Sequence, residues 1–446
     1  MPPDGSATNG KHRVVIVGGG FAGLGCARRL AEHDDVEITL IDRNNYHQFQ
    51  PLLYQVATSQ LAASHIAFSL RKLFRKHPNV SVKLAEAASV DPATHTVVTT
   101  DGAEHTGDAV VIAAGAVPNF FGTPGAAEHS FPLYALTDAE RLRSRILAVF
   151  EEADRDPALI DRGALNFVVV GGGPTGVETA GALADLINET MIAEYHDIPA
   201  SRAKIHIVDL GDALLTPFSA KTHAYVAKVL GRKGVQIHLG VAVTGVGPGH
   251  VTLGDGTTIL TRCVIWGGGN MAPPLAGDVG ATQGRGGRIE VLPDLTVEGR
   301  PGVYAIGDVA NIPGRDGTLP QLGSVAMQSG VWAAENLLAD LDGRPRTPFH
   351  YRDKGIMAMI GRGAAIAAGP YRRELRGLPA FAAWLGVHAA LLTGARNRVE
   401  TFLEWGFDYF SRSRGPQILD RRAVTAIDWS DDTSQATEPT PAQTVP

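Results

Sequence analysis

A glycine-rich turn between a strand and a helix constrains the fold of this chain more than any other segment. Residues 11–17 end in a run of β-branched side chains, and Gly18-Gly-Gly-Phe-Ala-Gly23 follows at once. A helical stretch over 24–32 and a second strand over 36–41 come next, and the second strand ends at Asp42. This order of strand, turn, helix, strand and acid predicts the opening unit of a parallel, helix-covered sheet.

The three spaced glycines of this turn have separate tasks in such a unit. Gly18 permits the tight turn, Gly20 lets the backbone approach a pyrophosphate, and Gly23 lets the helix pack on the strand. The helix N-terminus then faces the anion, and Asp42 is placed to accept the ribose hydroxyls. Because the flanking elements match, we favour a dinucleotide site over a plain structural turn.

The same pattern occurs a second time in the middle of the chain. A strand over 166–170 precedes Gly171-Gly-Gly-Pro-Thr-Gly176, and a helix over 177–190 and a strand over 204–208 lead to Asp209. The motif glycines are Gly171, Gly173 and Gly176. Two such units predict two nucleotide cofactors. The carboxylate at Asp209 would repel a 2′-phosphate, so the second site is expected to take NADH.

Composition excludes several other classes. The chain has 446 residues, 44% of them hydrophobic and 19% charged, which is typical of a globular protein. The net charge of −6 gives no basic field for nucleic acid. Its two cysteines, Cys26 and Cys263, are too far apart for a redox pair, a thiolate metal site or a disulfide framework. No signal peptide is evident at the N-terminus, so a reducing cytoplasmic location is expected.

The chain resembles the type II NADH dehydrogenases, a group of flavoproteins with two dinucleotide-binding domains. The resemblance covers about residues 11–422. The segment most specific to this family is Asn45-Tyr-His-Gln-Phe-Gln-Pro-Leu-Leu-Tyr-Gln-Val-Ala-Thr58. Two further segments are similar, Val168–Glu178 with Ala180-Gly181 and Val110–Gly115. Disulfide reductases share the outline but have a cysteine pair in the first helix region, which this chain lacks.

The resemblance implies an α/β fold with two Rossmann-like domains, one for FAD and one for NADH. It places the FAD domain at 11–118 and 300–345, the NADH domain at 119–299 and a C-terminal helical region at 346–422. The ends, 1–10 and 423–446, are expected to be disordered. Besides the motif glycines and the two acids, it implies cofactor contacts at Gln50, Ala114, Gly115, Gly268, Gly307, Asp308 and Ala326. Gly307 and Asp308 follow a strand over 303–306 and open a predicted helix, with Asp308 on the flavin ribityl chain.

Two segments depart from the family pattern. Where the family often has Ala-Gln-x-Ala-x-Gln-Gln-Gly, this chain has Gly323–Gly330, in which only Ala326, Gln328 and Gly330 match. Gly267-Gly-Gly269 replaces the usual Ala-Ala-Gly. The first departure bears on the electron acceptor, and the second lies near the expected cofactor interface.

The resemblance implies that hydride passes from NADH to FAD and that two electrons then reach a membrane quinone without proton pumping. Glu178 is read either as an acid favoured by the helix dipole or as a functional carboxyl, and we favour the second. Gln328 would either hydrogen-bond a quinone carbonyl or cap the predicted helix over 321–338. His47 is expected to be a packed, hydrogen-bonded loop residue. Lys354 and Arg362 are expected to be solvated, with an acceptor tunnel as the alternative. No metal site is expected.

The C-terminal region is basic. Residues 371–422 contain nine arginines and five acids, a net charge of +4. The uncharged stretch 377–395 is too weakly apolar for a spanning helix. Over 399–410 one helical face is apolar, with Val399, Phe402, Leu403, Gly406 and Phe410 on it. Glu400, Glu404 and Asp408 would form an acidic stripe, Trp405 and Tyr409 would reach lipid headgroups, and Arg412, Arg414, Arg421 and Arg422 would meet an anionic leaflet.

These features favour a peripheral membrane enzyme on the cytoplasmic face, with packing on the body or across a homodimer as the alternative use of the C-terminal helices. Two other functions stay open at this point. One is a soluble NADH-dependent flavin reductase that donates to a ferredoxin-like protein. The other is an NADH-sensing flavoprotein that catalyses no reaction.

Overall fold

The computed structural model describes residues 11–315, 317–370, 373–411 and 414–420, together with Ile427 and Trp429. The chain divides into two compact units. Unit 1 consists of Met1–Phe49, Ala67–Asn119 and Asn270–Lys354, and unit 2 consists of Gln50–Ile66, Phe120–Gly269 and Gly355–Pro446. The ends expected to be disordered, 1–10 and 423–446, lie outside the described residues except for Ile427 and Trp429.

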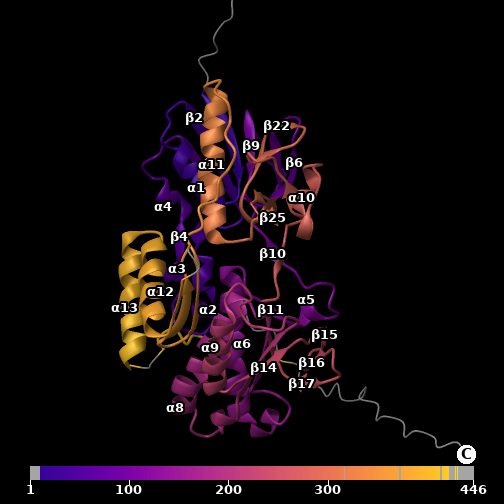
Figure 1. Cartoon of the computed structure of the whole chain (residues 1–446), viewed down its shortest axis with the longest axis vertical. Helices are drawn as coiled ribbons and strands as arrows, with labels where there is room; N and C mark the ends of the chain where they lie inside the picture. Colours follow the sequence, from indigo (N-terminus) through magenta and orange to yellow (C-terminus); the bar gives the residue numbers. More distant parts are fainter. Residues whose placement is uncertain are drawn as a thin grey trace, which may run out of the picture. The chain divides into compact units, whose positions relative to one another are not determined.

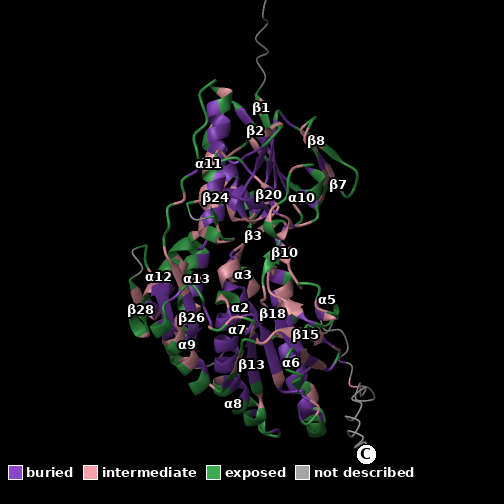
Figure 2. Ribbon diagram, turned by 45° about the vertical axis from the view of Figure 1, so that its right-hand side comes forward, coloured by how far each residue is buried: buried purple, intermediate pink, exposed green. Residues whose placement is uncertain are grey.

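A six-stranded sheet forms the centre of unit 1. Its order is β21-β22-β9-β1-β2-β5, and all neighbours are parallel except β21 and β22. The strands are β1 (His12–Val17), β2 (Val36–Asp42), β5 (Val80–Leu84), β9 (Ala109–Ile112), β21 (Thr296–Val297) and β22 (Arg300–Ala305). The β-branched run expected to be a buried strand is β1, whose last four residues are buried (Figure 2).

Two helices that are far apart in the sequence lie side by side on this sheet (Figure 1). They are α1 (Phe21–Leu30) and α11 (Gly323–Leu341). A methyl group on Gly25 would lie 2.9 Å from the carbonyl oxygen of Met327, and one on Gly330 would lie 2.0 Å from that of Ala22. Glycine on both helices therefore permits the close contact.

The chain returns to unit 1 at Asn270, whereas we expected the return at residue 300. The short strand β19 (Asn270–Met271) pairs with β10 (Val117–Pro118), so the outgoing and returning crossovers hydrogen-bond to each other. The other elements of unit 1 are β3 (Tyr46–Gln48), β4 (Ala67–Ser69), α4 (Leu70–Leu73), β6 (Ala87–Asp91), β7 (Thr96–Thr99), β8 (Glu104–Thr106), α10 (Leu275–Asp278), η5 (Arg285–Gly287), β20 (Ile289–Glu290), η6 (Gly307–Val309), β23 (Ala310–Asn311), β24 (Pro313–Gly314) and β25 (Gly317–Thr318).

Unit 2 is built on a second, five-stranded parallel sheet with the order β11-β18-β12-β13-β14. The strands are β11 (Phe131–Pro132), β12 (Asn166–Val170), β13 (Lys204–Asp209), β14 (Val235–Leu239) and β18 (Cys263–Trp266). The helix after the glycine turn, α7 (Pro174–Asp185), continues as the π-helix η3 (Leu186–Met191). The expected α/β class with two sheets that each open on a glycine turn is confirmed.

A third layer of unit 2 covers α7. The antiparallel strands β26 (Ile356–Gly361), β27 (Ala364–Ala368) and β28 (Glu374–Arg376) pack against it, and the chain continues into α12 (Leu378–Leu391) and α13 (Ala395–Ser411). The other elements are η1 (Gln50–Leu52), α2 (Leu53–Ala57), α3 (Ala63–Ile66), α5 (Ala126–His129), α6 (Leu136–Arg155), η2 (Pro157–Ile160), α8 (Ile192–Glu194), η4 (Ala200–Arg202), α9 (Ala220–Arg232), β15 (Val243–Val246), β16 (His250–Leu253) and β17 (Thr258–Leu260).

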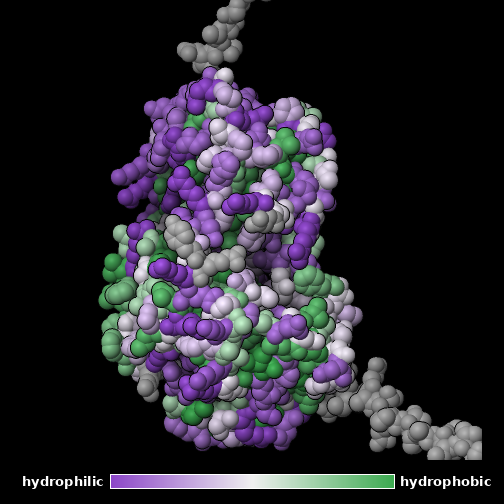
Figure 3. Space-filling view, in the orientation of Figure 1, coloured by the Kyte–Doolittle hydropathy of each residue, from purple (hydrophilic) through white to green (hydrophobic). Residues whose placement is uncertain are grey.

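Helix α13 has the expected two faces, and its apolar face points outward. The outer face of α13 consists of Val399, Phe402, Leu403, Phe407 and Phe410, all exposed, with 85% exposure at Phe410. In Figure 3, apolar residues gather at the left edge of the view, where Figure 1 places α12 and α13. No helix in the described part of the chain is long and apolar enough to cross a bilayer.

The inward face of α13 is polar, which corrects two expectations for this helix, and a third is corrected at Arg414, which follows the helix. Trp405 does not reach outward, because it is buried and its Nε1 donates to Gln55 Oε1 at 2.8 Å. Asp408 is not part of an exposed stripe, because its carboxylate is buried and accepts from Gln60 Nε2 at 2.7 Å. Arg414 is buried as well, so it is not available to a leaflet. Arg412, Arg421 and Arg422 lie outside the described residues.

Candidate functional site

The first glycine turn is closed by backbone contacts that exclude a side chain. Gly18 has a φ of +104°, and a methyl group there would lie 2.3 Å from the carbonyl oxygen of Ala113. A methyl group on Gly23 would lie 1.8 Å from the carbonyl oxygen of Gly18. A methyl group on Gly20 would meet nothing within 4 Å among the described residues. The turn is therefore closed at its first and third glycines and open at its second.

The backbone of Gly19 is hydrogen-bonded through both its N–H and its carbonyl group. Its N–H donates to Asp42 Oδ2 at 2.6 Å, and its carbonyl accepts from His47 Nδ1 at 3.0 Å. Burial raises the pKa of Asp42, and the N–H groups of Gly19 and Asn44 oppose this rise. Burial lowers the pKa of His47 to about 4, so the ring is neutral at pH 7. His47 is packed and hydrogen-bonded, as predicted, but it lies on the short strand β3 and not in a loop.

The second turn repeats this construction in unit 2. Gly171 has a φ of +109°, and a methyl group on Gly176 would lie 1.8 Å from its carbonyl oxygen. The N–H of Gly172 donates to Asp209 Oδ2 at 2.5 Å, and its carbonyl accepts from the N–H of Leu215 at 2.8 Å. Gly173 faces open space, as Gly20 does.

The third glycine cluster lies against this second turn. A methyl group on Gly171 would lie 2.4 Å from the carbonyl oxygen of Gly267 and 3.1 Å from the Cα of Gly268. Gly269 has a φ of +140°, a conformation that other residues rarely adopt. The close approach therefore requires glycine at position 171. Methyl groups on Gly267 and Gly268 would lie no nearer than 3.3 Å to Val170 O and Trp266 Nε1, so the departure from Ala-Ala-Gly has no structural explanation.

The other residues expected to contact flavin lie at the carboxyl ends of strands or at the start of α11. Ala114 and Gly115 follow β9, and Gly115 has a φ of +70°. Gly307 and Asp308 follow β22 but form only the short 3-10 turn η6, so the helix expected to open there begins later, at Gly323. A methyl group on Gly307 would lie 2.8 Å from Ala22 Cβ and 3.5 Å from Ala326 Cβ. Parallel strands place these ends at one edge of the unit 1 sheet.

The residues present fit a dinucleotide at each turn. Neither α1 nor α7 has a side-chain cap at its N-terminus or an acid in its first turn, and the glycine in front of each helix is open. Such an N-terminus presents N–H groups and positive potential to a pyrophosphate. In unit 2, Gln50 Oε1 is buried with no hydrogen-bond partner among the described residues. Gly18, Gly20, Gly23 and Asp42 would hold FAD, and Gly171, Gly173, Gly176 and Asp209 would hold NADH.

Glu178 lies on the second turn of α7 and is only 8% exposed. Its Oε1 accepts a hydrogen bond from the N–H of Met359 on β26 at 3.0 Å. Burial raises the pKa of Glu178 to about 8, although the hydrogen bond from the N–H of Met359 favours its ionised form. A carboxyl of this kind can change protonation near neutral pH, which is the property expected of a proton-transferring group.

Two titratable side chains lie near Glu178. Tyr54 on α2 is buried, and burial together with the charge of Glu178 raises its pKa well above the usual value. His388 on α12 stacks on Trp384 with ring centroids 4.0 Å apart, and burial lowers its pKa to about 4. Burial therefore keeps His388 neutral and Tyr54 protonated at pH 7, whereas the pKa of Glu178 lies near neutral pH.

Gln328 on α11 does not cap that helix. Its Nε2 donates to the carbonyl oxygen of Arg352 at 3.1 Å, and its Oε1 accepts from the N–H of the same residue at 3.0 Å. The amide therefore pairs with an extended backbone segment as a neighbouring strand would. Lys354 stays exposed, as expected, but Arg362 does not.

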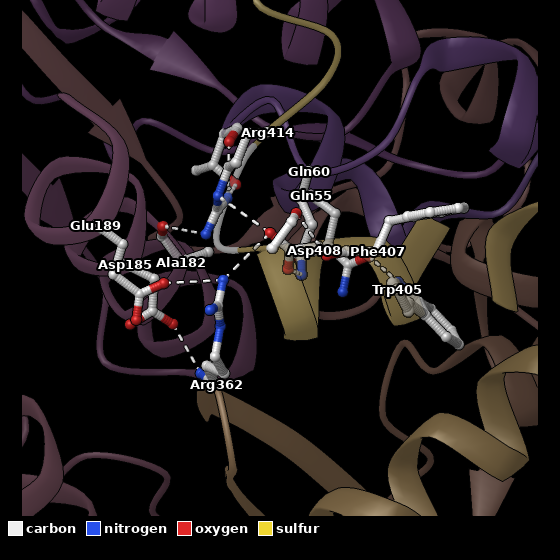
Figure 4. Close-up of polar contacts among 12 residues, drawn as sticks. Gln55, Gln60, Ala182, Asp185, Glu189, Arg362, Trp405, Phe407, Asp408 and Arg414 are labelled. Carbon is white, nitrogen blue, oxygen red and sulfur yellow. Dashed lines mark hydrogen bonds and ion pairs between the residues drawn. The ribbon is translucent and has the colours of Figure 1, made fainter. Parts of the chain in front are cut away.

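Sequence reasoning missed a cluster of buried and half-buried ionic groups in unit 2, most of which Figure 4 shows. The ionic cluster consists of Asp185, Glu189, Lys233, Arg362, Asp408 and Arg414. Arg362 was expected to be solvated, yet it pairs with Glu189 at 2.8 Å and with Asp408 at 3.3 Å. One sequence signal was available: Asp185 lies seven residues after Glu178, two helical turns along the same face.

Alanine at Gly173 is expected to weaken NADH binding without unfolding unit 2, because its methyl group would enter the open space before α7. We expect the dissociation constant for NADH to rise about tenfold, a loss of about 1.4 kcal/mol. The measurement is an NADH titration of the FAD-loaded protein. Gly231→Ala on α9, whose methyl group also meets nothing within 4 Å, is the control. Equal affinities in both variants would contradict the assignment.

The raised pKa of Glu178 also predicts how stability depends on pH. The folded chain holds a proton between the ordinary pKa of 4.5 and about 8 that the unfolded chain has released. This contribution to stability is present at acidic pH and is lost as the pH rises through the window. Glu178→Gln should therefore show a smaller fall in melting temperature between pH 6 and 9 than the wild type. Glu104→Gln, at an exposed position of β8, should keep the wild-type dependence.

Comparisons with known proteins agree with this geometry. The family model described as pyridine nucleotide-disulphide oxidoreductase matches residues 12–330. The type II NADH:quinone oxidoreductase Ndh of Mycobacterium tuberculosis is 38% identical, over 93% of this chain and 91% of that protein. The enzyme NdhA of the same organism is 36% identical, over 94% and 92%.

Solved structures show the same fold. The structure of NDH2 from Plasmodium falciparum in complex with NADH superposes with a TM-score of 0.83 at 20% identity, and the match covers 92% of this chain and all of that one. The sulfide:quinone oxidoreductase of Aquifex aeolicus superposes with a TM-score of 0.67 at 19% identity, over 90% and 96%. With two nucleotide turns, no cysteine pair and relatives of this similarity, the chain belongs to the pyridine nucleotide-disulphide oxidoreductases and, among them, to the type II NADH:quinone oxidoreductases.

Proposed function

We propose that this protein oxidises NADH at unit 2, holds FAD at unit 1 and reduces a quinone at a membrane surface without pumping protons. The observation that supports it most is the pair of open glycine turns, one in each unit, that leave room for two pyrophosphates. FAD, when bound, accepts a hydride from NADH and passes on two electrons. The chain orients both nucleotides through its glycine turns and its two acids.

Glu178 is the residue that we propose to hold and release a proton in the quinone step. Quinone reduction consumes two protons, and a buried carboxyl with a pKa of about 8 is protonated at pH 7. Its place on α7, four residues after the first helical residue, keeps it close to the open end of the NADH turn. Gln328 can contact a quinone only if its amide gives up its two hydrogen bonds with the backbone of Arg352 and bonds to the quinone instead.

The named relatives favour a quinone over the other acceptors considered. Ndh and NdhA are NADH:quinone oxidoreductases, and a plant relative, at 32% identity over 68% of this chain, is an NAD(P)H-ubiquinone oxidoreductase. A ferredoxin-like acceptor would require a docking surface for a protein. A sensor without catalysis would not require a carboxyl that titrates near neutral pH.

A spectroscopic experiment tests the proposed reaction. The purified protein should show a flavin spectrum that NADH bleaches and a short-chain quinone restores, and NADPH should bleach it more slowly because Asp209 faces the ribose site. In Glu178→Gln, NADH should still bleach the flavin, but restoration by quinone should lose its dependence on pH between 6 and 9. Bleaching that quinone does not reverse would contradict the acceptor. An unchanged pH dependence in the variant would contradict the role of Glu178.

We further propose that the outer face of α13 binds the cytoplasmic face of the cell membrane. Its side chains are apolar and exposed, with Phe402 at 60% and Phe407 at 68%. Residues 371–422 carry a net charge of +4, which suits an anionic leaflet. The two cysteines are buried and form no disulfide, which is consistent with a protein on the reducing, cytoplasmic side of the membrane. A homodimer that buries the same face is the alternative.

The membrane proposal predicts a specific loss of vesicle binding. Replacing Phe402, Phe407 and Phe410 with glutamine should lower partitioning into anionic vesicles about a hundredfold or more, because each buried ring contributes about 1.5–3 kcal/mol. The measurement is co-sedimentation with vesicles. Leu84→Gln/Leu210→Gln, which changes two exposed leucines elsewhere, should bind as the wild type does. If the phenylalanine variant binds equally well, the membrane proposal fails. If it instead turns a dimer into a monomer, a second copy covers this face.

A further inference from the structure

Helix α7 is joined at two points to strand β26 and to Arg362, the residue that follows this strand. Glu178 accepts from the N–H of Met359 at 3.0 Å, and Asp185 Oδ2 accepts from the N–H of Arg362 at 2.7 Å. The strand is irregular between Met359 and Gly361, where Gly361 has a φ of +134°. The two hydrogen bonds, one on each side of this irregularity, hold the end of the strand in one position along the helix.

Gly181 lies between these two points and lets the backbones meet. A methyl group there would lie 2.1 Å from the carbonyl oxygen of Ile360 and 2.6 Å from its carbonyl carbon. If β26 slid along the axis of α7, the N–H of Met359 would move away from the carboxylate of Glu178. The hydrogen bond to the carboxylate thus depends on whatever holds the far end of the strand, at Arg362.

The side chain of Arg362 fixes that far end to two other elements. Its Nη2 pairs with Glu189 Oε2 on the π-helix η3 at 2.8 Å and with Asp408 Oδ1 on α13 at 3.3 Å (Figure 4). Asp408 also pairs with Arg414, whose Nη1 donates to the carbonyl oxygen of Thr58 at 2.8 Å. The guanidinium is 15% exposed and the Asp408 side chain 8%, so water screens this pair weakly.

We propose that Arg362 is a positioning residue for Glu178. Its backbone N–H sets the register of β26 on α7, and its guanidinium fastens the same end of the strand to Asp408 of α13. The N–H of Met359 then stays hydrogen-bonded to the carboxylate of Glu178. The position of α13 thereby determines how readily Glu178 ionises. The inference deepens the proposed role of Glu178 and rests on it for its meaning in the reaction.

Charge and geometry act in the same direction when Arg362 is removed. The ionic cluster has three carboxylates and three cations, so Arg362→Met leaves it with one excess negative charge. That charge disfavours ionised Glu178, and so does loss of the Met359 hydrogen bond. Both effects raise the pKa of Glu178. Arg362→Lys separates them, because it keeps the charge but its shorter side chain places the ammonium farther from Glu189 and Asp408 than Nη2 of Arg362 lies.

The test measures titration and hydrogen exchange in the full-length, FAD-loaded protein. The carboxyl band of Glu178 is followed by infrared difference spectroscopy against pH, with Glu178→Gln as the blank. Amide exchange at Met359 is followed by mass spectrometry. We expect Arg362→Met to raise the midpoint by about one pH unit, a tenfold change in proton affinity, and to speed exchange at Met359. Arg362→Lys should also speed that exchange and raise the midpoint less.

Arg396→Met on α13 is the matched control, because it removes an exposed arginine that pairs with Glu400 at 2.6 Å. It should leave midpoint and exchange at their wild-type values. Arg362→Met with wild-type exchange at Met359 would overturn the proposal, even if the midpoint moves, since the effect would then be charge alone. Arg362→Lys with wild-type values of both would overturn it as well. If Arg362→Met does not retain FAD, the exchange at Met359 and the midpoint of Glu178 in Arg362→Lys decide whether the proposal stands.

The outcome is separable from that of the proposed function. If Glu178→Gln reacts with quinone as the wild type does at every pH, the role of Glu178 in the reaction fails. The titration and exchange data would still show whether Arg362 positions the carboxyl. If the role of Glu178 holds and Arg362→Met changes neither measurement, only the positioning inference fails.

Discussion

The backbone contact between the third and first glycines of each turn determines how the rest of each unit is arranged. A side chain at Gly23 or Gly176 would lie 1.8 Å from a carbonyl oxygen, so each helix can lie this close to its strand only because a hydrogen atom stands there. Because the helix lies so close to the strand, the uncapped N-terminus of α1 or α7 faces the open space at Gly20 or Gly173. The same closeness also brings the N–H of Gly19 or Gly172 within reach of the acid that ends the next strand.

Those acids do more than the sequence suggested. We expected Asp42 and Asp209 to meet ribose hydroxyls, and each carboxylate also accepts a hydrogen bond from the N–H of the residue between the first two spaced glycines, Gly19 or Gly172. The carbonyl group of the same residue accepts from a second donor, His47 Nδ1 or the N–H of Leu215. Each acid thus stabilises the glycine turn through a hydrogen bond. Its loss would affect both the shape of the turn and the recognition of the sugar.

The sequence was sufficient for the features that depend on local pattern. The two glycine turns and their flanking strands follow from residue order and periodicity, and the structure has them. It was insufficient where a side chain finds its partner far away in the chain. Periodicity divided α13 into two faces, but it could not show that Gln55, Gln60 and Arg362 would supply partners for Trp405 and Asp408. With those partners the polar face can be buried, and the apolar face is left outside.

The orientation of α13 has a consequence for how this protein can change over evolutionary time. Its inward positions, Trp405 and Asp408 among them, have distant polar partners, so substitutions there are constrained by folding. Its outward positions, such as Phe402 and Phe410, contact little of the chain and can vary with small effects on stability. Attachment through this face can therefore be strengthened, weakened or redirected by mutation without disturbing the core. Homologues with nearly identical interiors could differ widely in what their outer helix adheres to.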